Sequence, residues 1–152
     1  MSEQYEMTIR KAREVDMPRI IQMITEVFKG EQEIPAELIP IPDEKKPQWW
    51  VMERDGVLLG TTALYAEGNE WHMGRFAIVP EARGEGLGTR LLLHAMEEAF
   101  AQGIDCIIGE ARDTTVHIAK KLGAEVTGEA VPFYEGTVTP MIIHRETFLN
   151  QS

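Results

Sequence analysis

The segment at residues 78–90, IVPEARGEGLGTR, carries the clearest pattern for chemistry in this sequence. Three glycines in five residues stand between two arginines, in the order Arg83, Gly84, Gly86, Gly88 and Arg90. Glycines let a backbone approach a ligand and turn several N–H groups toward one point. A helix that starts directly behind them adds unpaired N–H donors and the positive end of its dipole. The pattern predicts a site for phosphate or pyrophosphate, with a strand-to-helix turn that binds nothing as the alternative.

Two common phosphate-binding motifs do not fit this segment. A P-loop requires Gly-Lys-Ser/Thr at the start of its helix, and the segment contains no such sequence. The fingerprint for a dinucleotide requires a third glycine three residues after the second, where this chain has Thr89. A different ligand that carries phosphate groups is therefore expected.

Hydrophobic periodicity and turn residues place this loop within a series of strands and helices. Strands are predicted at 7–11, 49–53, 57–65, 70–79, 104–111, 125–129 and 141–144, and helices at 16–29, 86–102 and 114–122. Gly30 is expected to end the first helix, and Asp55-Gly56 to form a hairpin turn. Hairpins followed by one β-α-β crossover predict an α/β fold, with a mixed, mostly antiparallel sheet and helices on both faces.

The stretch from Gly30 to Pro47 contains four prolines, which rule out a long helix. It is too apolar for a linker. We expect an ordered loop with one short helix at 36–39, which either shapes a binding site or packs over the core.

Length and charge set the class of protein. The 152 residues suffice for a single domain, expected over residues 1–152, and the formal net charge of −10 disfavours nucleic acid or an anionic membrane as the main partner. The negative net charge does not exclude the binding of one small anionic ligand by local basic residues. The single Cys106 excludes an internal disulfide, and the four histidines have no metal spacing, so no metal is expected. The N-terminus is charged and no apolar run reaches about 18 residues, so we expect a cytoplasmic protein.

The order Arg83-Gly84-Glu85-Gly86-Leu87-Gly88 fits the pattern Arg/Gln-x-x-Gly-x-Gly/Ala. With the strand before it and the long helix after it, this segment resembles the acyl-CoA pyrophosphate loop of the GNAT superfamily of N-acetyltransferases. The whole predicted order of elements is similar to that fold. A narrower resemblance, to the ElaA/YjcF-like bacterial branch, rests on residues 27–37 (VFKGEQEIPAE) and on Arg75-Phe76-Ala77-Ile78.

The resemblance implies an acyltransferase in which a primary amine attacks the thioester of acetyl-CoA directly. In such enzymes the strand before the loop pairs with the pantetheine arm, a role that falls on Ile78 and Val79. The pyrophosphate would then be bound by the loop and the first helical turn, at Arg83, Gly84, Glu85, Gly86, Leu87, Gly88, Thr89 and Arg90.

The sequence departs from the family at the acid that protonates the leaving thiolate. Many members carry a tyrosine four residues before the glycine that ends the short helix, and this chain has Ala119 there. The branch also tends to carry a histidine after the proline of the last strand, where this chain has Met141 after Pro140. The acid is therefore unassigned.

Three residues are candidates for the proton transfers. His72 lies where related enzymes carry their base, and an imidazole exchanges protons near neutral pH. Glu110 ends the strand after the long helix, and Tyr134 offers a phenol that suits protonation of a thiolate. The alternatives are a surface histidine, a solvated acid at a strand end and a surface tyrosine. Arg112, Lys120 and Lys121 either contact the nucleotide end of CoA or belong to a solvated helix face.

The acidic balance favours a small cationic acceptor such as a polyamine, an aminoglycoside or a lysine-like amine. Since the tyrosine expected at position 119 is missing, the alternative is a CoA-binding module with little or no transferase activity that serves regulation or interaction. A dimeric scaffold with an empty loop is a third interpretation. Homodimers are common in the family, and the sequence leaves both a monomer and a homodimer open.

Overall fold

The computed structural model describes residues 7–32, 34–35 and 39–150. The strands are β1 (Met7–Lys11), β2 (Gln48–Arg54), β3 (Val57–Glu67), β4 (Glu70–Ile78), β5 (Cys106–Ala111), β6 (Glu125–Val126), β7 (Val131–Pro132) and β8 (Thr137–His144). The helices are α1 (Met17–Gln32), α2 (Leu87–Ala101), α3 (Asp113–Lys121) and α4 (Arg145–Leu149). Short 3-10 turns cover Glu14–Asp16, Asp43–Lys45 and Pro80–Ala82.

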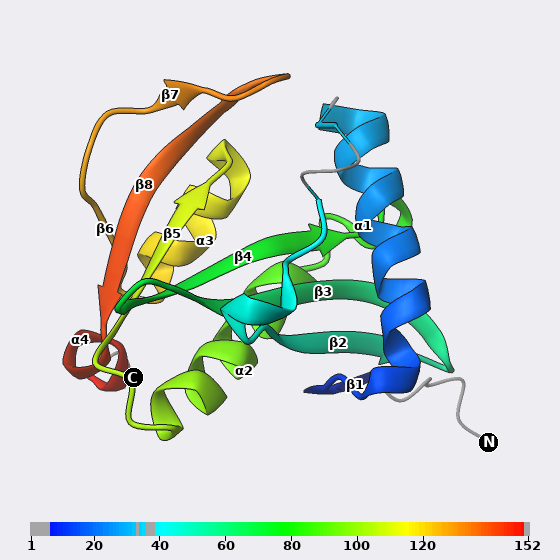
Figure 1. Cartoon of the computed structure of the whole chain (residues 1–152), viewed down its shortest axis with the longest axis horizontal. Coiled ribbons are helices and arrows are strands. Elements are labelled where there is room, and N and C mark those ends of the chain that lie inside the picture. Colours follow the sequence, from blue (N-terminus) through cyan, green and yellow to red (C-terminus); the bar gives the residue numbers. More distant parts are fainter. Residues whose placement is uncertain (1–6, 33, 36–38, 151–152) are drawn as a thin grey trace.

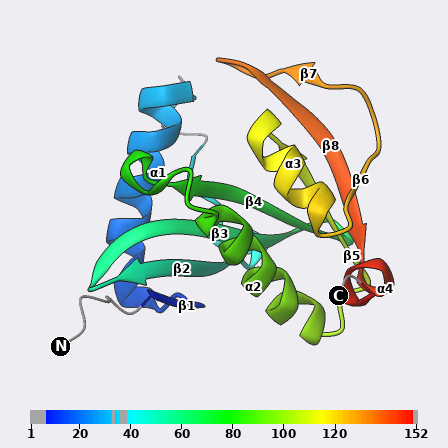
Figure 2. The same ribbon diagram turned by 180° about the vertical axis from the view of Figure 1, so that it is seen from behind.

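The strands form one mixed sheet in the order β1-β2-β3-β4-β5-β8-β6, and β7 pairs with β8. Neighbouring strands are antiparallel except β4 and β5, which are parallel. Helix α1 covers one face of the sheet, and α2 and α3 cover the other (Figures 1 and 2). The predicted α/β fold with a mixed, mostly antiparallel sheet between helices is confirmed.

Two apolar clusters fix the helices to the two faces. The cluster under α2 contains Trp50, Leu91 and Phe100, whereas the cluster under α1 contains Ile24 and Trp49. Trp49 and Trp50 are adjacent in β2, and successive side chains of a strand point to opposite faces. Trp50 therefore packs in the apolar layer between the sheet and α2, and Trp49 packs in the layer between the sheet and α1.

The hairpin predicted at Asp55-Gly56 is confirmed, and both residues have a positive φ, 52° and 79°. The prediction that Gly30 ends the first helix is wrong, because α1 continues to Gln32. Phe28 and Ile34 are buried, and the Ile34 N–H donates to the Phe28 carbonyl oxygen at 3.1 Å. A glycine costs only about 1 kcal/mol in a helix, and this packing outweighs that cost.

The strand predicted at 104–111 begins two residues later, at Cys106, and the larger differences lie at the C-terminal end. The last strand begins at Thr137 and not at residue 141, the strand predicted at 125–129 covers only two residues, and β7 and α4 were not predicted. The short helix expected at 36–39 falls almost entirely on residues 36–38, which lie outside the described residues. No helix in the described part of the chain has the length and apolar character needed to cross a membrane.

Candidate functional site

The loop between β4 and α2 has the backbone conformation that its glycines predict. Gly84 and Gly86 have φ values of 84° and 76°, in the region that glycine tolerates and other residues rarely adopt. A Cβ atom added to either residue would meet no atom within 4 Å, so the space beside both glycines is open to a ligand. Gly86 is the N-cap of α2, and no side chain caps the helix there. The first N–H groups of this 15-residue helix are therefore available to an anion.

Hydrogen bonds and one ion pair hold this loop against the sheet. Arg83 Nε donates to the Ile78 carbonyl oxygen at 2.9 Å, and the Val79 N–H donates to the Leu59 carbonyl oxygen in β3 at 2.8 Å. Glu85 forms an ion pair with Arg54 at 3.6 Å. The loop is thus held at the end of β4 by its own side chains and backbone.

Gly88 brings α2 close to β4. A Cβ atom at this position would stand 2.8 Å from Cζ of Phe76 and 3.2 Å from Cδ1 of Ile118. A side chain at this position would force Phe76 to shift, so glycine permits the approach of α2 as it stands. Phe76 also lines the cavity described next, so the close packing of Gly88 on Phe76 places the start of α2 next to that cavity.

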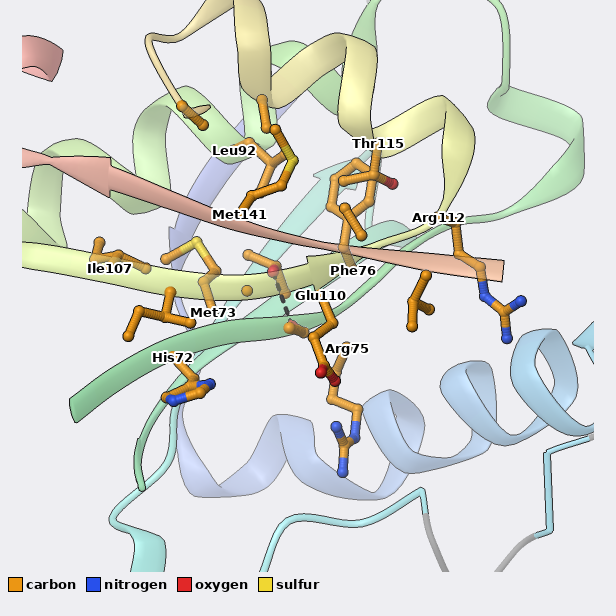
Figure 3. A pocket seen from close by; sticks show the side chains of 18 of the residues that line it. His72, Met73, Arg75, Phe76, Leu92, Ile107, Glu110, Arg112, Thr115 and Met141 are labelled. Carbon is orange, nitrogen blue, oxygen red and sulfur yellow. Dashed lines mark hydrogen bonds between the residues drawn. The ribbon is translucent and has the colours of Figure 1, made fainter. Parts of the chain in front are cut away.

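A cavity of about 220 Å³ lies where β4 and β5 separate. The parallel pairing of these strands is confined to His72 and Ile108. The cavity is lined from the α1 side by Phe28 and Tyr65, and from the α2 and α3 side by Leu92, Thr115 and Ala119. Figure 3 shows these two sides: Leu92 and Thr115 lie above the strands, whereas His72, Glu110 and Arg75 point below them, toward α1. The cavity therefore passes through the sheet.

A β-bulge interrupts β4 at the centre of this cavity. The register of β3 and β4 shifts between Thr61 and Ala63, and Arg75 has a φ of 52°. The Thr62 hydroxyl donates to the Gly74 carbonyl oxygen at 2.9 Å, and Arg75 Nε donates to the Ile39 carbonyl oxygen at 2.6 Å. A bulge leaves a residue unpaired in the ladder and redirects its side chain. Here it directs Arg75 to the α1 side of the cavity, over the Tyr65 ring.

The structure brings two of the three predicted acid–base candidates to the cavity. His72 Nε2 lies 3.2 Å from Oε1 of Glu70, and its ring stacks on Tyr65 with 5.7 Å between the ring centres. Glu110 is exposed, and its carboxylate lies on the same side of the sheet as His72 (Figure 3). Tyr134 lies at the turn between β7 and β8, is 50% exposed and does not line the cavity, whereas its neighbour Phe133 does.

The positions that depart from the family pattern also line the cavity. Ala119 and Met141 are both buried there, so neither a phenol nor an imidazole reaches the cavity from these two places. Among the residues that the structure describes, no three histidine, cysteine, aspartate or glutamate side chains are grouped so that they would hold a metal ion.

Two arginines of the cavity were not predicted as site residues. Arg75 reaches it through the bulge, which no local pattern in the sequence reveals. Arg112 was grouped with Lys120 and Lys121, yet it lines the cavity while both lysines are exposed on α3. A signal existed for Arg112, because it follows Glu110 by two residues and such residues of a strand share a face.

Comparisons with known proteins agree with this architecture. The family described as acetyltransferase (GNAT) family matches residues 16–124. The peptidyl-lysine N-acetyltransferase YjaB of Salmonella typhimurium is 27% identical over 108 residues, which cover 70% of this chain and 68% of that protein. Escherichia coli ElaA has a TM-score of 0.77 at 16% identity, over 92% of this chain and 99% of ElaA. The yncA protein of Salmonella typhimurium, solved with its cofactor acetyl-CoA, has a TM-score of 0.71 at 18% identity, over 92% and 94% of the two chains. Since the family match covers well over half of its length, the chain belongs to the acetyltransferase (GNAT) family.

Proposed function

We propose that this protein transfers an acetyl group from acetyl-CoA to the primary amine of a small acceptor. The observation that carries the proposal is the cavity through the sheet at the separation of β4 and β5. It joins the side of the sheet with Leu92 and Thr115, which belong to α2 and α3, to the side with His72 and Glu110. An acyl donor and an amine that enter from opposite faces would meet between the two strands.

The loop is suited to the pyrophosphate of acetyl-CoA. Its open space beside Gly84 and Gly86 and the uncapped start of α2 offer N–H donors to an anion. The proposal assigns the phosphate contacts to residues 83–90, with Arg83 and Arg90 adding positive charge. Support also comes from the structural relative yncA, whose cofactor is acetyl-CoA.

The free edge of β4 is suited to the pantetheine arm. The Val79 N–H is already bonded to β3. Because backbone groups alternate along an antiparallel strand, those of Ile78 point to the other side, toward the gap beside β5. The Ile78 carbonyl oxygen accepts a hydrogen bond from Arg83 Nε. The N–H of Ile78 is proposed to donate to an amide oxygen of the pantetheine arm.

In the proposed reaction, the amine nitrogen attacks the thioester carbon, a C–N bond forms and the C–S bond breaks. The ammonium form of the acceptor must first lose a proton, and His72 or Glu110 takes it, directly or through water. A proton must also reach the leaving thiolate. Tyr134 lies outside the cavity, so its phenol would reach the sulfur only after a shift of the turn that contains Phe133.

The acceptor is proposed to be a small amine. Buried Ile34 and Ile39 help to close the α1 side of the cavity, which favours a small molecule over a folded protein. The Salmonella relative YjaB is a peptidyl-lysine N-acetyltransferase, which supports an alkyl amine as the attacking group.

Release of free CoA thiol tests this function. The protein is mixed with acetyl-CoA and a panel of primary amines, and the thiol is titrated with a chromogenic disulfide. We expect release that depends on both the amine and the enzyme, together with the acetylated amine by mass spectrometry. Because Ala119 stands where a catalytic tyrosine is usual, a CoA-binding module is the second candidate. That module predicts tight CoA binding with no thiol release from any amine.

Variants of the two acid–base candidates identify the base. His72→Gln and Glu110→Gln are made separately, and the variant that removes the base should lower kcat about 100-fold near neutral pH. Its rate should recover as the pH rises, because the free amine then forms without a base. The dissociation constant of acetyl-CoA should not change. His117→Gln, on the exposed face of α3, is the matched control. Equal rates and pH profiles for all three variants would exclude both residues as the base.

A further inference from the structure

Arg112 lines the same cavity as Glu110. It follows β5 directly, and its backbone is still extended, with φ −68° and ψ 162°. It is two residues from Glu110, so the two side chains leave the same face, from Cα atoms about 6.6 Å apart. Figure 3 shows Glu110 pointing to the α1 side of the strands, and Arg112 extending past the strand ends from the start of α3. Both residues line the cavity, so an acceptor whose amine lies at Glu110 would meet Arg112 at a second point of the same cavity.

The guanidinium of Arg112 is only partly satisfied by the protein. Nη1 donates to the Glu135 carbonyl oxygen at 3.2 Å, and the guanidinium carbon lies 5.3 Å from the centre of the Phe133 ring. Nη2 is shielded from solvent and has no acceptor among the residues that the structure describes. Burial lowers the pKa of Arg112, and nearby Asp113 offsets this only in part. A buried charged donor without a partner is costly, and an anion that accepts from it removes that cost.

The charges of the cavity lining differ from those of the whole protein. The chain has a net charge of −10, yet within residues 7–32, 34–35 and 39–150 the charged residues that line the cavity are Arg75, Arg112 and Glu110. A carboxylate on the acceptor would pair with the Arg112 guanidinium, whereas a polyamine would bring further positive charge to it.

We propose that the acceptor carries a carboxylate as well as its amine, and that Arg112 binds this carboxylate. The inference rests on the proposed acetyl transfer and specifies its substrate class, an amino acid or a related amino-carboxylate. The amine lies at Glu110 and His72, and the carboxylate accepts from the guanidinium fork. The neighbours of the guanidinium are in the turn at Phe133–Gly136. A small outward shift of this turn opens Nη2 to the ligand.

Arg112 also has contacts that would suit a purely structural role, since it binds the Glu135 carbonyl oxygen and packs on Phe133. That role predicts an equal loss of activity toward every acceptor when Arg112 is replaced. Recognition of a carboxylate predicts a loss confined to acceptors that carry one. The two roles are therefore separated by a pair of acceptors that differ only in this group.

The test uses an ω-amino acid and its carboxamide, which share the primary amine and differ by one negative charge, at several chain lengths. For the wild type we expect kcat/KM to be at least about 10-fold higher for the acid. Arg112→Gln should lower kcat/KM about 10- to 100-fold for the acid and less than about 3-fold for the carboxamide, and Arg112→Lys should restore part of the preference. Lys121→Gln removes the same charge from the exposed face of α3 and is the control.

Binding is measured in parallel by calorimetry of the acid and the carboxamide with the protein–CoA complex, so that the result does not depend on turnover. We expect the acid to bind more tightly, and Arg112→Gln to remove the difference. Equal binding of both compounds to the wild type, or an equal loss for both in Arg112→Gln, would overturn the inference. So would transfer to a lysine-containing peptide in preference to every amino-carboxylate. Absence of thiol release with every amine contradicts the proposed function itself, and the binding result then still decides the role of Arg112.

Discussion

Replacing Gly86 with glutamate should lower the affinity for acetyl-CoA at least about 100-fold. Gly86 has a φ of 76° and caps the start of α2, with open space beside its Cα. A glutamate would place a side chain in that space and a negative charge where the phosphates are proposed to bind, and it would oppose the binding of an anion at the helix start. Calorimetry with CoA measures the loss. A thermal shift adds a second reading, because CoA at 100 times its dissociation constant should stabilise the wild type by about 2.7 kcal/mol and the variant far less.

The control for this variant is Gly56→Glu. Gly56 has a φ of 79° and also has no atom within 4 Å of an added Cβ, but it lies in the hairpin between β2 and β3. Gly56→Glu therefore introduces the same backbone strain and the same added negative charge as Gly86→Glu, but at a position outside the glycine loop at 83–88. Gly56→Glu should lose stability and keep the affinity for CoA. Unchanged affinity in Gly86→Glu would mean that the phosphates bind elsewhere.

The parts of this protein that the sequence predicts are those with local causes. The loop at 83–88 and the long helix behind it are predicted because glycine spacing and an apolar stripe act within a few residues. The turn at Asp55-Gly56 is predicted for the same reason, since its residue types suit positive φ angles. The order of such elements was then enough to indicate the fold.

The rest of the site depends on contacts between distant segments. The bulge that redirects Arg75 is fixed by the Thr62 hydroxyl on Gly74 and by the Ile39 carbonyl oxygen, and both Thr62 and Ile39 are distant from it in sequence. The Arg112 guanidinium is held by a turn more than 20 residues later, whose Glu135 carbonyl oxygen accepts from Nη1. The order of the elements along the chain does not predict such contacts. They decide which charged side chains face the acceptor.

A buried ion cluster joins β1, β2 and α1 at the far end of the sheet from β8, and Asp16 is its centre. Asp16 is 2% exposed and accepts from Arg10 at 2.9 and 3.1 Å, from Arg19 at 3.0 Å and from the Arg13 N–H at 2.7 Å. Glu53 lies against both Arg10 and Arg19 on the other side. Each of these two arginines thus bridges two carboxylates, and the hydrogen bonds from Arg10 hold the pKa of Asp16 well below its usual range.

Asp16→Asn should lower the free energy of unfolding by about 3 kcal/mol. The change removes one charge from a cluster in which both arginines then lack a full partner, and it turns an amide N–H₂ toward cationic donors. The arginines keep some contact with water, which limits the loss to the lower part of the range for buried ion pairs. Urea denaturation at pH 7 measures the difference. Asp43→Asn removes an exposed carboxylate and should change stability by less than about 0.5 kcal/mol.

The pH dependence of the stability difference between the wild type and Asp16→Asn shows whether the charge of Asp16 causes it. Because the pKa of Asp16 is lowered in the folded state, its charge stabilises the fold fully above the unfolded-state pKa, about 3.9. The advantage of the wild type over Asp16→Asn should therefore be constant from pH 8 to about pH 5. It should shrink as the pH falls below about 4 toward the lower pKa of the folded protein, where both states bind the proton. Glu53, whose pKa Arg19 also lowers through its hydrogen bond, adds acid sensitivity of the same sign. Because it shares Arg10 and Arg19 with Asp16, the comparison is repeated in a Glu53→Gln background to separate the two carboxylates. A difference that stays the same at pH 3 would show that the shape of the side chain, and not its charge, stabilises this corner of the fold.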